Sequence, residues 1–344
     1  MATRPTVGAI RVSVIIKALN EEARIAAAIQ SALSALRKLP CLGEVILADS
    51  CSTDETLRIA ANYPIRVVTL ANPDERSCGI GPQLGYQYTT GDFVYILDGD
   101  MELDEDFLKA GLEFLMRHPG VAGVGGQVEE RVTTSLEYAR RARRAKVNMR
   151  PGETDRLEMG GLYRCRAIDQ VGYFSDRNLR SYEELDLGMR LRARGWRLWR
   201  LDCPSVIHHG HADGTLALLL RRWRNGYLCG IGQLLRASVG EPHMRIVLSS
   251  VSELRLYLAV LMWWALLVAI PFLPVRPWAA TELFAGVLAA PFALAALLRR
   301  SVLDAFVTVT SWCFHAAGLV RGFIQARRPP MSAVRSTLVK DFYI

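Results

Sequence analysis

Several features that mark other protein classes are missing from this sequence. The seven cysteines are scattered without any C-x-x-C pair, which indicates reduced thiols in the cytoplasm. No nucleic-acid-binding motif is visible, although the net charge is +8. Residues 1–9 lack the apolar core of a signal peptide, so we expect none. These features favour a basic protein whose amino-terminal domain stays in the cytoplasm and which contacts anionic lipid or an anionic substrate, and no nucleic acid.

The apolar residues, 51% of the 344, are in excess in the last third of the chain. Leu254–Pro274 and Trp278–Leu298 are each long enough to span a bilayer. Asp304–Ile324 is weaker because it holds charged residues, so it is either a third span or a re-entrant or interfacial helix. Arg299 and Arg300 favour an inner-membrane, multi-pass protein whose amino-terminal domain faces the cytoplasm.

The amino-terminal part alternates short apolar runs with helical patterns, which predicts an α/β fold with a mostly parallel sheet covered by helices. The predicted strands are 12–16, 44–48, 65–70, 93–97 and 121–128. The predicted helices are 22–39, 54–61, 79–88 and 104–117.

Two carboxylates, Asp98 and Asp100, directly follow the predicted strand Phe93–Leu97. Ligand crevices of open α/β sheets lie at the carboxyl ends of the strands. Paired carboxylates form a hard oxygen site, which suits Mg²⁺ or Mn²⁺ shared with phosphate oxygens. A calcium loop is excluded because its sixth position is Leu103 rather than glycine and its twelfth is Lys109 rather than glutamate.

Acceptor-rich loops follow the first two strands. Asn20-Glu21 comes after strand one, and Asp49 and Ser52 come after strand two. Such side chains suit the donors of a uracil ring and a ribose. Ser52 also fits a plain helix cap, whereas Asp49 lies before that helix and favours a ligand role.

Together these motifs resemble a family 2 glycosyltransferase with a GT-A, Rossmann-like fold that binds nucleotide sugars. The resemblance covers roughly Arg11 to Trp223 and implies an inverting transferase that uses a nucleotide-diphosphate sugar, most often a UDP-sugar, with a divalent metal. By that match, Asp98 would lie near the ribose and the metal, and Asp100 would bind the metal directly. The residues implied near the nucleoside are Asn20, Glu21, Asp49 and Ser52.

Two positions depart from the family pattern. Lys17 stands where many relatives have proline. Gly81-Pro82-Gln83-Leu84-Gly85 replaces an Ala-Arg-Asn-x-Gly pattern, so the usual arginine is missing. Arg76 is our candidate for supplying that charge to the nucleotide.

The segment from Gly160-Gly161 to Leu191 resembles the acceptor half of the same family, in which a carboxylate takes the proton of the acceptor hydroxyl. Aligning Asp186-Leu187 with the family's x-Asp-Leu-x-x-Arg-Leu helix places this base at Glu184, with Glu183 and Asp186 as alternatives. Carboxylates in a first helical turn are also favoured by the helix dipole alone. Gly161 is implied on the acceptor and diphosphate side, and Arg190 is expected to form a structural ion pair.

Two further motifs are partial. His208, His209 and His211 lie together, and His208 is the candidate for contacting the metal or diphosphate, because relatives often carry a histidine there. Arg222-Trp223 matches the end of the Gln-x-x-Arg-Trp motif of processive synthases, but Leu219 replaces the glutamine, which favours single-sugar transfer. The helix predicted around them, 217–235, also suits an anionic membrane surface.

We therefore expect a GT-A domain over 1–213, an interfacial helical segment over 214–250, a membrane domain over 251–326 and a tail over 327–344. The hypothesis is a membrane-bound inverting glycosyltransferase with a lipid-linked or glycan acceptor, as in polysaccharide or glycolipid biosynthesis. One alternative is a catalytically silent membrane subunit that retains the fold. The other is a nucleotidyltransferase, which usually shows a Gly-rich, Lys/Arg-containing loop after strand one.

Overall fold

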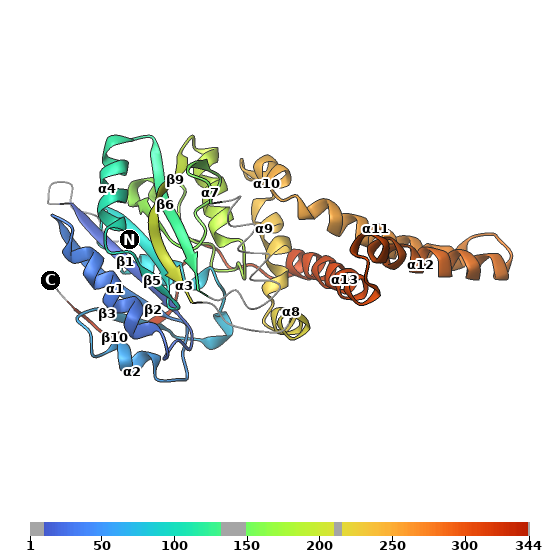
Figure 1. The fold of residues 1–344 in the computed structure, drawn as a ribbon, viewed down its shortest axis with the longest axis horizontal. Coiled ribbons are helices and arrows are strands. Elements are labelled where there is room, and N and C mark those ends of the chain that lie inside the picture. The colour runs from blue at the N-terminus through green and yellow to red at the C-terminus, as the bar shows by residue number, and fades with distance from the viewer. Residues whose placement is uncertain (1–9, 132–148, 210–214, 343–344) are drawn as a thin grey trace. The chain divides into compact units, whose positions relative to one another are not determined.

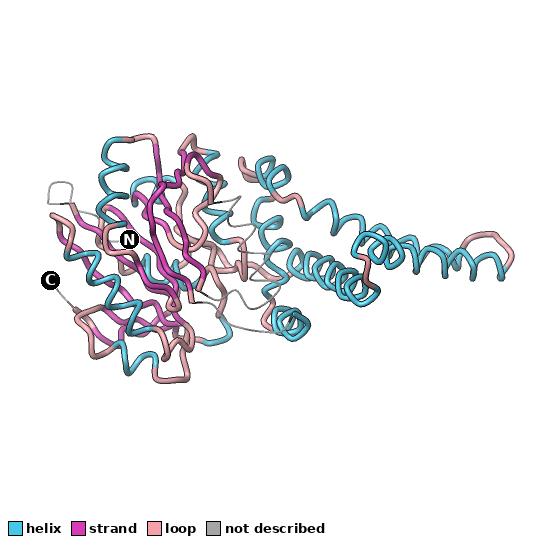
Figure 2. The backbone as a smooth tube through the Cα atoms, in the orientation of Figure 1, coloured by secondary structure: helices cyan, strands magenta, loops and turns pink. Residues whose placement is uncertain are grey.

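The computed structural model describes residues 10–131, 149–209 and 215–342. Residues 1–9 and His211, which entered the sequence predictions, lie outside these ranges. The chain divides into two compact units (Figure 1). Unit 1 comprises Met1–Asp213 and Arg327–Ile344, and unit 2 comprises Gly214–Ala326. Among the described residues, all the strands belong to unit 1, whereas unit 2 is helical (Figure 2).

Unit 1 is built on one mixed sheet with the strand order β10-β3-β2-β1-β4-β8-β6-β9-β5, and β7 pairs with β9. The strands are β1 Arg11–Ala18, β2 Leu42–Asp49, β3 Arg66–Leu70, β4 Phe93–Asp98, β5 Met101–Leu103, β6 Val121–Glu130, β7 Gly152–Thr154, β8 Gly161–Arg164, β9 Arg197–His208 and β10 Ser336–Lys340. The run β3-β2-β1-β4 is parallel, which confirms the prediction for the first half of the domain. The second half differs, because β8 runs antiparallel to both β4 and β6, and β5 and β7 run antiparallel to β9.

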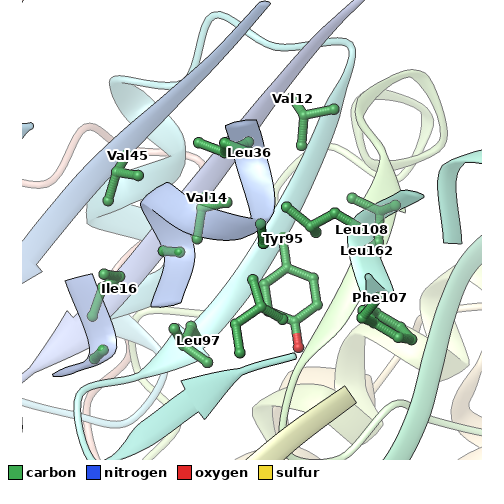
Figure 3. Close-up of a cluster of buried hydrophobic side chains, with 14 of the residues drawn as sticks. Val12, Val14, Ile16, Leu36, Val45, Tyr95, Leu97, Phe107, Leu108 and Leu162 are labelled. Carbon is green, nitrogen blue, oxygen red and sulfur yellow. The ribbon is translucent and has the colours of Figure 1, made fainter. Parts of the chain in front are cut away.

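Helices cover both faces of this sheet. They are α1 Ile25–Arg37, α2 Thr56–Ala60, η1 Pro73–Glu75, α3 Ile80–Gln87, α4 Phe107–Arg117, α6 Cys165–Gln170 and α7 Glu183–Ala193. Side chains alternate between faces along a strand, so Val12 and Val14 of β1 pack in the cluster that contains α1 and α4 (Figure 3). Ile15 packs in the cluster that contains α3, α6 and α7. A strand buried on both faces explains the unbroken apolar run in the sequence.

Two predicted elements differ from the structure. The turn at Gly195-Trp196 predicts a following strand that ends near Leu201, but β9 continues through Pro204 to His208. Its pairing with β6 shifts register around Pro204, where the ladder lacks a donor. The helix predicted over 217–235 is broken into α8 (Thr215–Arg224), η2 (Tyr227–Cys229) and α9 (Gly230–Ser238). Gly226 lies at the break with φ +75°, a conformation that ends a helix.

The carboxyl-terminal segment is not a simple tail, because it returns to unit 1. β10 pairs antiparallel with β3 at the edge of the sheet. Before it, Arg327 pairs with Asp176 at 2.7 Å, and Arg328 pairs with Glu75, which also pairs with Arg177. Through these ion pairs, Arg327 and Arg328 connect the loop before α7 and the loop after β3.

Unit 2 contains three helices that are long and apolar enough to cross a membrane. The first consists of α11 Glu253–Ala269 and η3 Ile270–Phe272, the second is α12 Pro277–Arg299 and the third is α13 Val302–Ile324, while α10 Met244–Ser250 precedes them. The spans have mean hydropathies of 1.9, 1.9 and 1.3. The third segment, which was the weaker prediction, is thus a continuous helix of spanning length.

Close packing of α13 depends on glycine. A Cβ on Gly322 would come within 3.0 Å of the Cys229 carbonyl oxygen, and one on Gly318 would meet the Leu228 carbonyl in the same way. Small residues allow helix backbones to approach closely in membrane proteins.

We expect Gly322→Ala to lower the stability of unit 2 by about 1–3 kcal/mol, the usual cost of overpacking. The matched control is Gly286→Ala in α12, where an added Cβ meets nothing within 4 Å and alanine is the better helix former by up to about 1 kcal/mol. Thermal unfolding in detergent measures both. Equal shifts in the two variants would contradict the packing argument.

Candidate active site

The carboxyl ends of β1, β2 and β4 meet at one edge of the sheet. Lys17 of β1 is in register with Asp98 of β4, and Ala18 is in register with Asp49 of β2. The Ser50 amide donates to the Ala18 carbonyl at 2.9 Å, and the Gly99 amide donates to the Lys17 carbonyl at 2.9 Å. Backbone hydrogen bonds therefore hold the three loops that carry the predicted donor-binding residues against one another.

Asn20 and Ser52 join the first two of these loops. The Asn20 amide donates to Ser52 Oγ at 2.8 Å, and the Thr53 amide donates to Asn20 Oδ1 at 2.8 Å. The Glu21 amide donates to Thr56 Oγ1 at 2.8 Å. These hydrogen bonds therefore link the loop after β1 to the loop after β2.

Asp49 and Arg76 support these loops from inside. The Asp49 side chain is buried, and its Oδ2 accepts from the Ser52 amide at 3.0 Å and from Thr69 Oγ1 at 2.7 Å. Arg76 donates to the carbonyls of Ser50, at 2.7 Å, and Cys51. In this structure both residues shape the loop after β2, and their contact with a nucleotide stays a prediction.

Strained backbone gathers around the same edge. Five described non-glycine residues have positive φ, and four of them are Asn20 (57°), Cys51 (60°), Met159 (59°) and Tyr182 (69°). Asn20 and Cys51 lie in the loops after β1 and β2, while Met159 precedes β8 and Tyr182 precedes α7. Such conformations persist where the surrounding structure fixes them, and they concentrate at functional sites.

Negative charge accumulates beside Asp98 and Asp100. Burial, together with the charges of Asp100, Asp98 and Asp54, raises the pKa of Glu21 to about 7. A partly neutralised glutamate next to two aspartates indicates an unbalanced acidic site. A bound cation would relieve this repulsion.

His208 connects Asp100 to a second carboxylate. His208 Nε2 lies 3.2 Å from Asp100 Oδ2, and Nδ1 lies 2.6 Å from Glu130 Oε2. Burial lowers the pKa of His208, but its hydrogen bonds to Asp100 and Glu130 outweigh burial and raise it to about 9. Sequence reasoning missed Glu130, because nothing in the sequence marks the end of β6 as adjacent to the end of β9.

The chemistry of this donor set fits a divalent cation. Octahedral Mg²⁺ ligands at about 2.1 Å from the metal lie about 3 Å from each other, close to the separation of Asp100 and His208. A carboxylate behind the imidazole is the usual support of a metal-bound histidine. Within the described ranges, no three His, Cys, Asp or Glu side chains form a metal site by themselves, so phosphate or water oxygens would have to complete the coordination.

Glu183 and Glu184 begin α7 across the site. The Met159 amide, oriented by its left-handed backbone, donates to Glu184 Oε1 at 3.3 Å. Burial raises the pKa of Glu184 to about 8, and the neighbouring Glu183 also raises it, whereas Lys17 lowers it. A carboxyl group with a pKa near neutrality is suited to proton transfer.

The other predicted acceptor-side residues fall in three places. Asp186 is fully buried and pairs with Arg190 at 2.8 Å, which confirms the predicted ion pair of Arg190 and directs this carboxylate into the core. Gly161 opens β8 and pairs with Ile96 of β4, two residues before Asp98.

Arg222 and Trp223 belong to α8 of unit 2, where Arg222 lies over the Tyr227 ring and Trp223 packs against Phe314.

His209 differs from His208 in its partner. Its Nε2 lies 2.6 Å from Glu102 Oε1, a carboxylate two residues beyond Asp100 in the sequence. The two described histidines therefore contact Asp100 differently: the His208 ring faces its carboxylate at 3.2 Å, whereas His209 only donates its backbone amide to the Asp100 carbonyl at 3.1 Å.

The carboxylates of this sheet gather at the carboxyl ends of its parallel strands, where open α/β folds bind their ligands. The model of glycosyl transferase family 2 matches residues 13–173. A Bacillus subtilis protein named "Putative glycosyltransferase EpsE" is 31% identical over 204 residues, which are 56% of this chain and 70% of EpsE. The chain therefore belongs to glycosyl transferase family 2.

Two further similarities extend over nearly the whole chain. The succinoglycan biosynthesis protein ExoA of Rhizobium meliloti is 25% identical over 338 residues, covering 92% of this chain and 96% of ExoA. The mannosyltransferase PcManGT of Pyrobaculum calidifontis, solved with GDP-Man and Mn²⁺, superposes with a TM-score of 0.58 at 20% identity, covering 94% of this chain and 89% of PcManGT; this shows the shared fold. Plant glucomannan mannosyltransferases are matched over only 28–29% of their length.

Proposed function

We propose that this protein is a membrane-anchored, inverting glycosyltransferase that moves a sugar from a nucleotide-diphosphate donor, preferentially a UDP-sugar, to a lipid-linked or glycan acceptor. The observation that carries the proposal is the placement of two carboxylate sets at one sheet edge. Asp98 ends β4 and Asp100 follows it, whereas Glu183 and Glu184 begin α7. Lys17 contacts a member of each set.

The donor side consists of the loops after β1 and β2. Asn20, Glu21 and Ser52 present acceptor groups to the nucleoside, with Asp49 and Arg76 behind them. Relatives of this fold have been solved with GDP-Man and with UDP-GlcNAc, which supports a nucleotide sugar as the class of donor.

Asp100, with Asp98 and His208, would hold Mg²⁺ or Mn²⁺. When bound, the ion supplies positive charge to the departing diphosphate. Because a ligating imidazole must be neutral, His208 would give up its proton on binding, and Glu130 would fix its ring orientation.

The chemical step falls to Glu184. Its carboxylate takes the proton of the acceptor hydroxyl as that oxygen attacks the anomeric carbon from the face opposite the nucleotide. Glu183 keeps the local potential negative. A Cβ on Gly161 would meet the buried side chains of Leu157 and Tyr163, so this glycine serves the packing beside β4. One displacement of this kind inverts the configuration of the transferred sugar.

The acceptor class follows from unit 2. Its three spanning-length helices carry many exposed apolar side chains, which suits a lipid environment. We place the protein in the inner membrane with unit 1 in the cytoplasm, and we assign the arginines and tryptophan of α8, including Arg222 and Trp223, to the lipid or acceptor surface.

Purified protein in detergent, with membrane lipid extract and Mn²⁺, tests the function against a panel of sugar nucleotides. Release of nucleoside diphosphate from one donor supports the transferase and identifies its sugar. Release of pyrophosphate instead would indicate a nucleotidyltransferase. Binding of a donor without any release, across a range of acceptors, would favour a silent subunit.

The pKa of Glu184 predicts how the rate depends on pH. Only the deprotonated form accepts a proton, and with a pKa of about 8 this form is the minor one at pH 7. We therefore expect kcat/KM to rise with pH, by up to about tenfold per unit, and to level off above about pH 8. Initial rates between about pH 6 and pH 9, at saturating metal, measure this; a flat profile would exclude Glu184 as the base.

A further inference from the structure

Lys17 occupies the gap between the two carboxylate sets. Its Nζ lies 3.1 Å from Asp98 Oδ1 and 3.5 Å from Glu183 Oε1. The side chains of Lys17 and Glu183 are only 19% and 11% exposed. A partly buried ion pair is screened less by salt than an exposed one, so this contact is suited to fixing geometry.

The neighbouring elements make room for this lysine. Gly81 of α3 faces the base of its side chain, and a Cβ at Gly81 would lie 3.1 Å from Lys17 Cβ, closer than ordinary contact. Arg76, the other cation of this edge that the sequence singled out, donates to the Ser50 and Cys51 carbonyls instead. The absence of a side chain at Gly81 thus leaves room beside the Lys17 Cβ, and Arg76 is engaged by the loop after β2.

We propose that Lys17 is a positioning residue of the transfer reaction, whose ammonium holds Asp98 at the end of β4 and Glu183 at the start of α7 in one ion-paired group. The proposal rests on the proposed function. The donor and the acceptor are bound by different elements, and displacement requires their reacting atoms to be aligned closely. A cation that contacts a carboxylate of each element aligns α7 with the donor-binding edge.

Charge repulsion explains why this link is needed. Asp98, Glu183 and Glu184 would repel one another without an intervening cation. The carboxylate of Glu184, next in sequence to Glu183, depends on the orientation of the first turn of α7. Lys17 lowers the pKa of Glu184, against the effect of burial and of Glu183, so the same ammonium also favours the basic form.

Lys38 provides a matched control. Its Nζ also bridges two carboxylates, Glu105 at 2.7 Å and Asp106 at 2.9 Å, but it is 37% exposed and lies away from the sheet edge, where α1 ends and α4 begins. An exposed pair of this kind contributes little to stability. If the effect of Lys17→Met came from losing a lysine that bridges two carboxylates anywhere in the fold, Lys38→Met would show it as well. An effect confined to Lys17→Met is specific to the lysine at the sheet edge.

The first measurement is steady-state kinetics of wild type, Lys17→Met, Lys17→Arg and Lys38→Met with the donor that gives product release. We expect Lys17→Met to lower kcat by about 10²-fold, as for misplaced reacting groups, with a smaller change in the donor KM. Lys17→Arg should recover part of kcat, and Lys38→Met should match wild type. An unchanged kcat in Lys17→Met, or a loss confined to KM, overturns the proposal.

The second measurement needs no turnover. Mn²⁺ binding to the nucleotide-free protein is followed by electron paramagnetic resonance. Removing a positive charge that is paired with Asp98 should tighten Mn²⁺ binding about tenfold in Lys17→Met, whereas damage to the fold would weaken it. If wild type releases nothing from any donor, the proposed function fails, and unchanged Mn²⁺ affinity in Lys17→Met would still overturn the role of Lys17.

Discussion

Replacing Glu184 with glutamine is expected to lower the rate of sugar transfer by about 10²–10⁴-fold, the range for loss of a general base, while donor binding is retained. The amide has nearly the same shape as the carboxylate and can still accept from the Met159 amide, which lies 3.3 Å away, but it cannot take a proton. Product release and calorimetric binding of the nucleoside diphosphate measure the two properties separately.

Glu183→Gln is the matched comparison for this variant. Glu183 pairs with Lys17, so its loss should disturb the geometry of α7 and reduce the rate less than the loss of Glu184 does. If Glu183→Gln removes activity and Glu184→Gln retains it, the base is Glu183. Fold integrity is checked by thermal unfolding of both variants.

Replacing Asp100 with asparagine is expected to lower kcat/KM by about 10²–10³-fold, equivalent to a few kcal/mol of lost charge stabilisation. The change removes the charge that faces His208 Nε2 at 3.2 Å and leaves the side-chain size almost unchanged. Activity should then respond weakly to added Mn²⁺ or Mg²⁺. Metal titrations of the transfer rate measure this.

Glu102→Gln serves as the control for Asp100, because Glu102 is a nearby acidic residue that pairs with His209 rather than with His208. We expect its metal dependence to be that of wild type. Removing the metal with a chelator should reproduce the defect of Asp100→Asn in the wild-type protein. Full metal-dependent transfer by Asp100→Asn would eliminate Asp100 as a metal ligand.

Local sequence patterns predicted the parallel half of the sheet well. Apolar runs between turn residues identify strands buried on both faces, and each such strand is followed by its own loop and helix, so β1, β2, β3 and β4 could be placed with their loops. The antiparallel half could not be predicted in this way. The pairing of β8 between β4 and β6 depends on contacts between residues that are distant in sequence.

The residues of the candidate site also divide into those that local sequence patterns predict and those that only the fold brings together. Asp98 and Asp100 stand out by their spacing after a predicted strand, and Glu184 was identified through the resemblance to the family's acceptor helix. Glu130 and Lys17 gain their roles only from the fold: Glu130 through the neighbouring strands β6 and β9, and Lys17 through the approach of α7 to the end of β1. A long-range ion pair leaves no periodic pattern along the chain, so sequence reasoning saw Lys17 only as a departure from proline.

Because residues 327–342 return to the edge of the sheet, unit 1 cannot be isolated by a simple truncation of the chain. Unit 2 is an insertion between two parts of unit 1, so ending the chain before the apolar helices also removes β10 and bares the hydrogen-bonding edge of β3, which is prone to aggregation. Preparing unit 1 without detergent therefore calls for excising 214–326 and joining the two ends with a flexible linker. The excised helices, 214–326, would be prepared as a separate fragment, and its thermal unfolding in detergent would be compared with that of the intact chain.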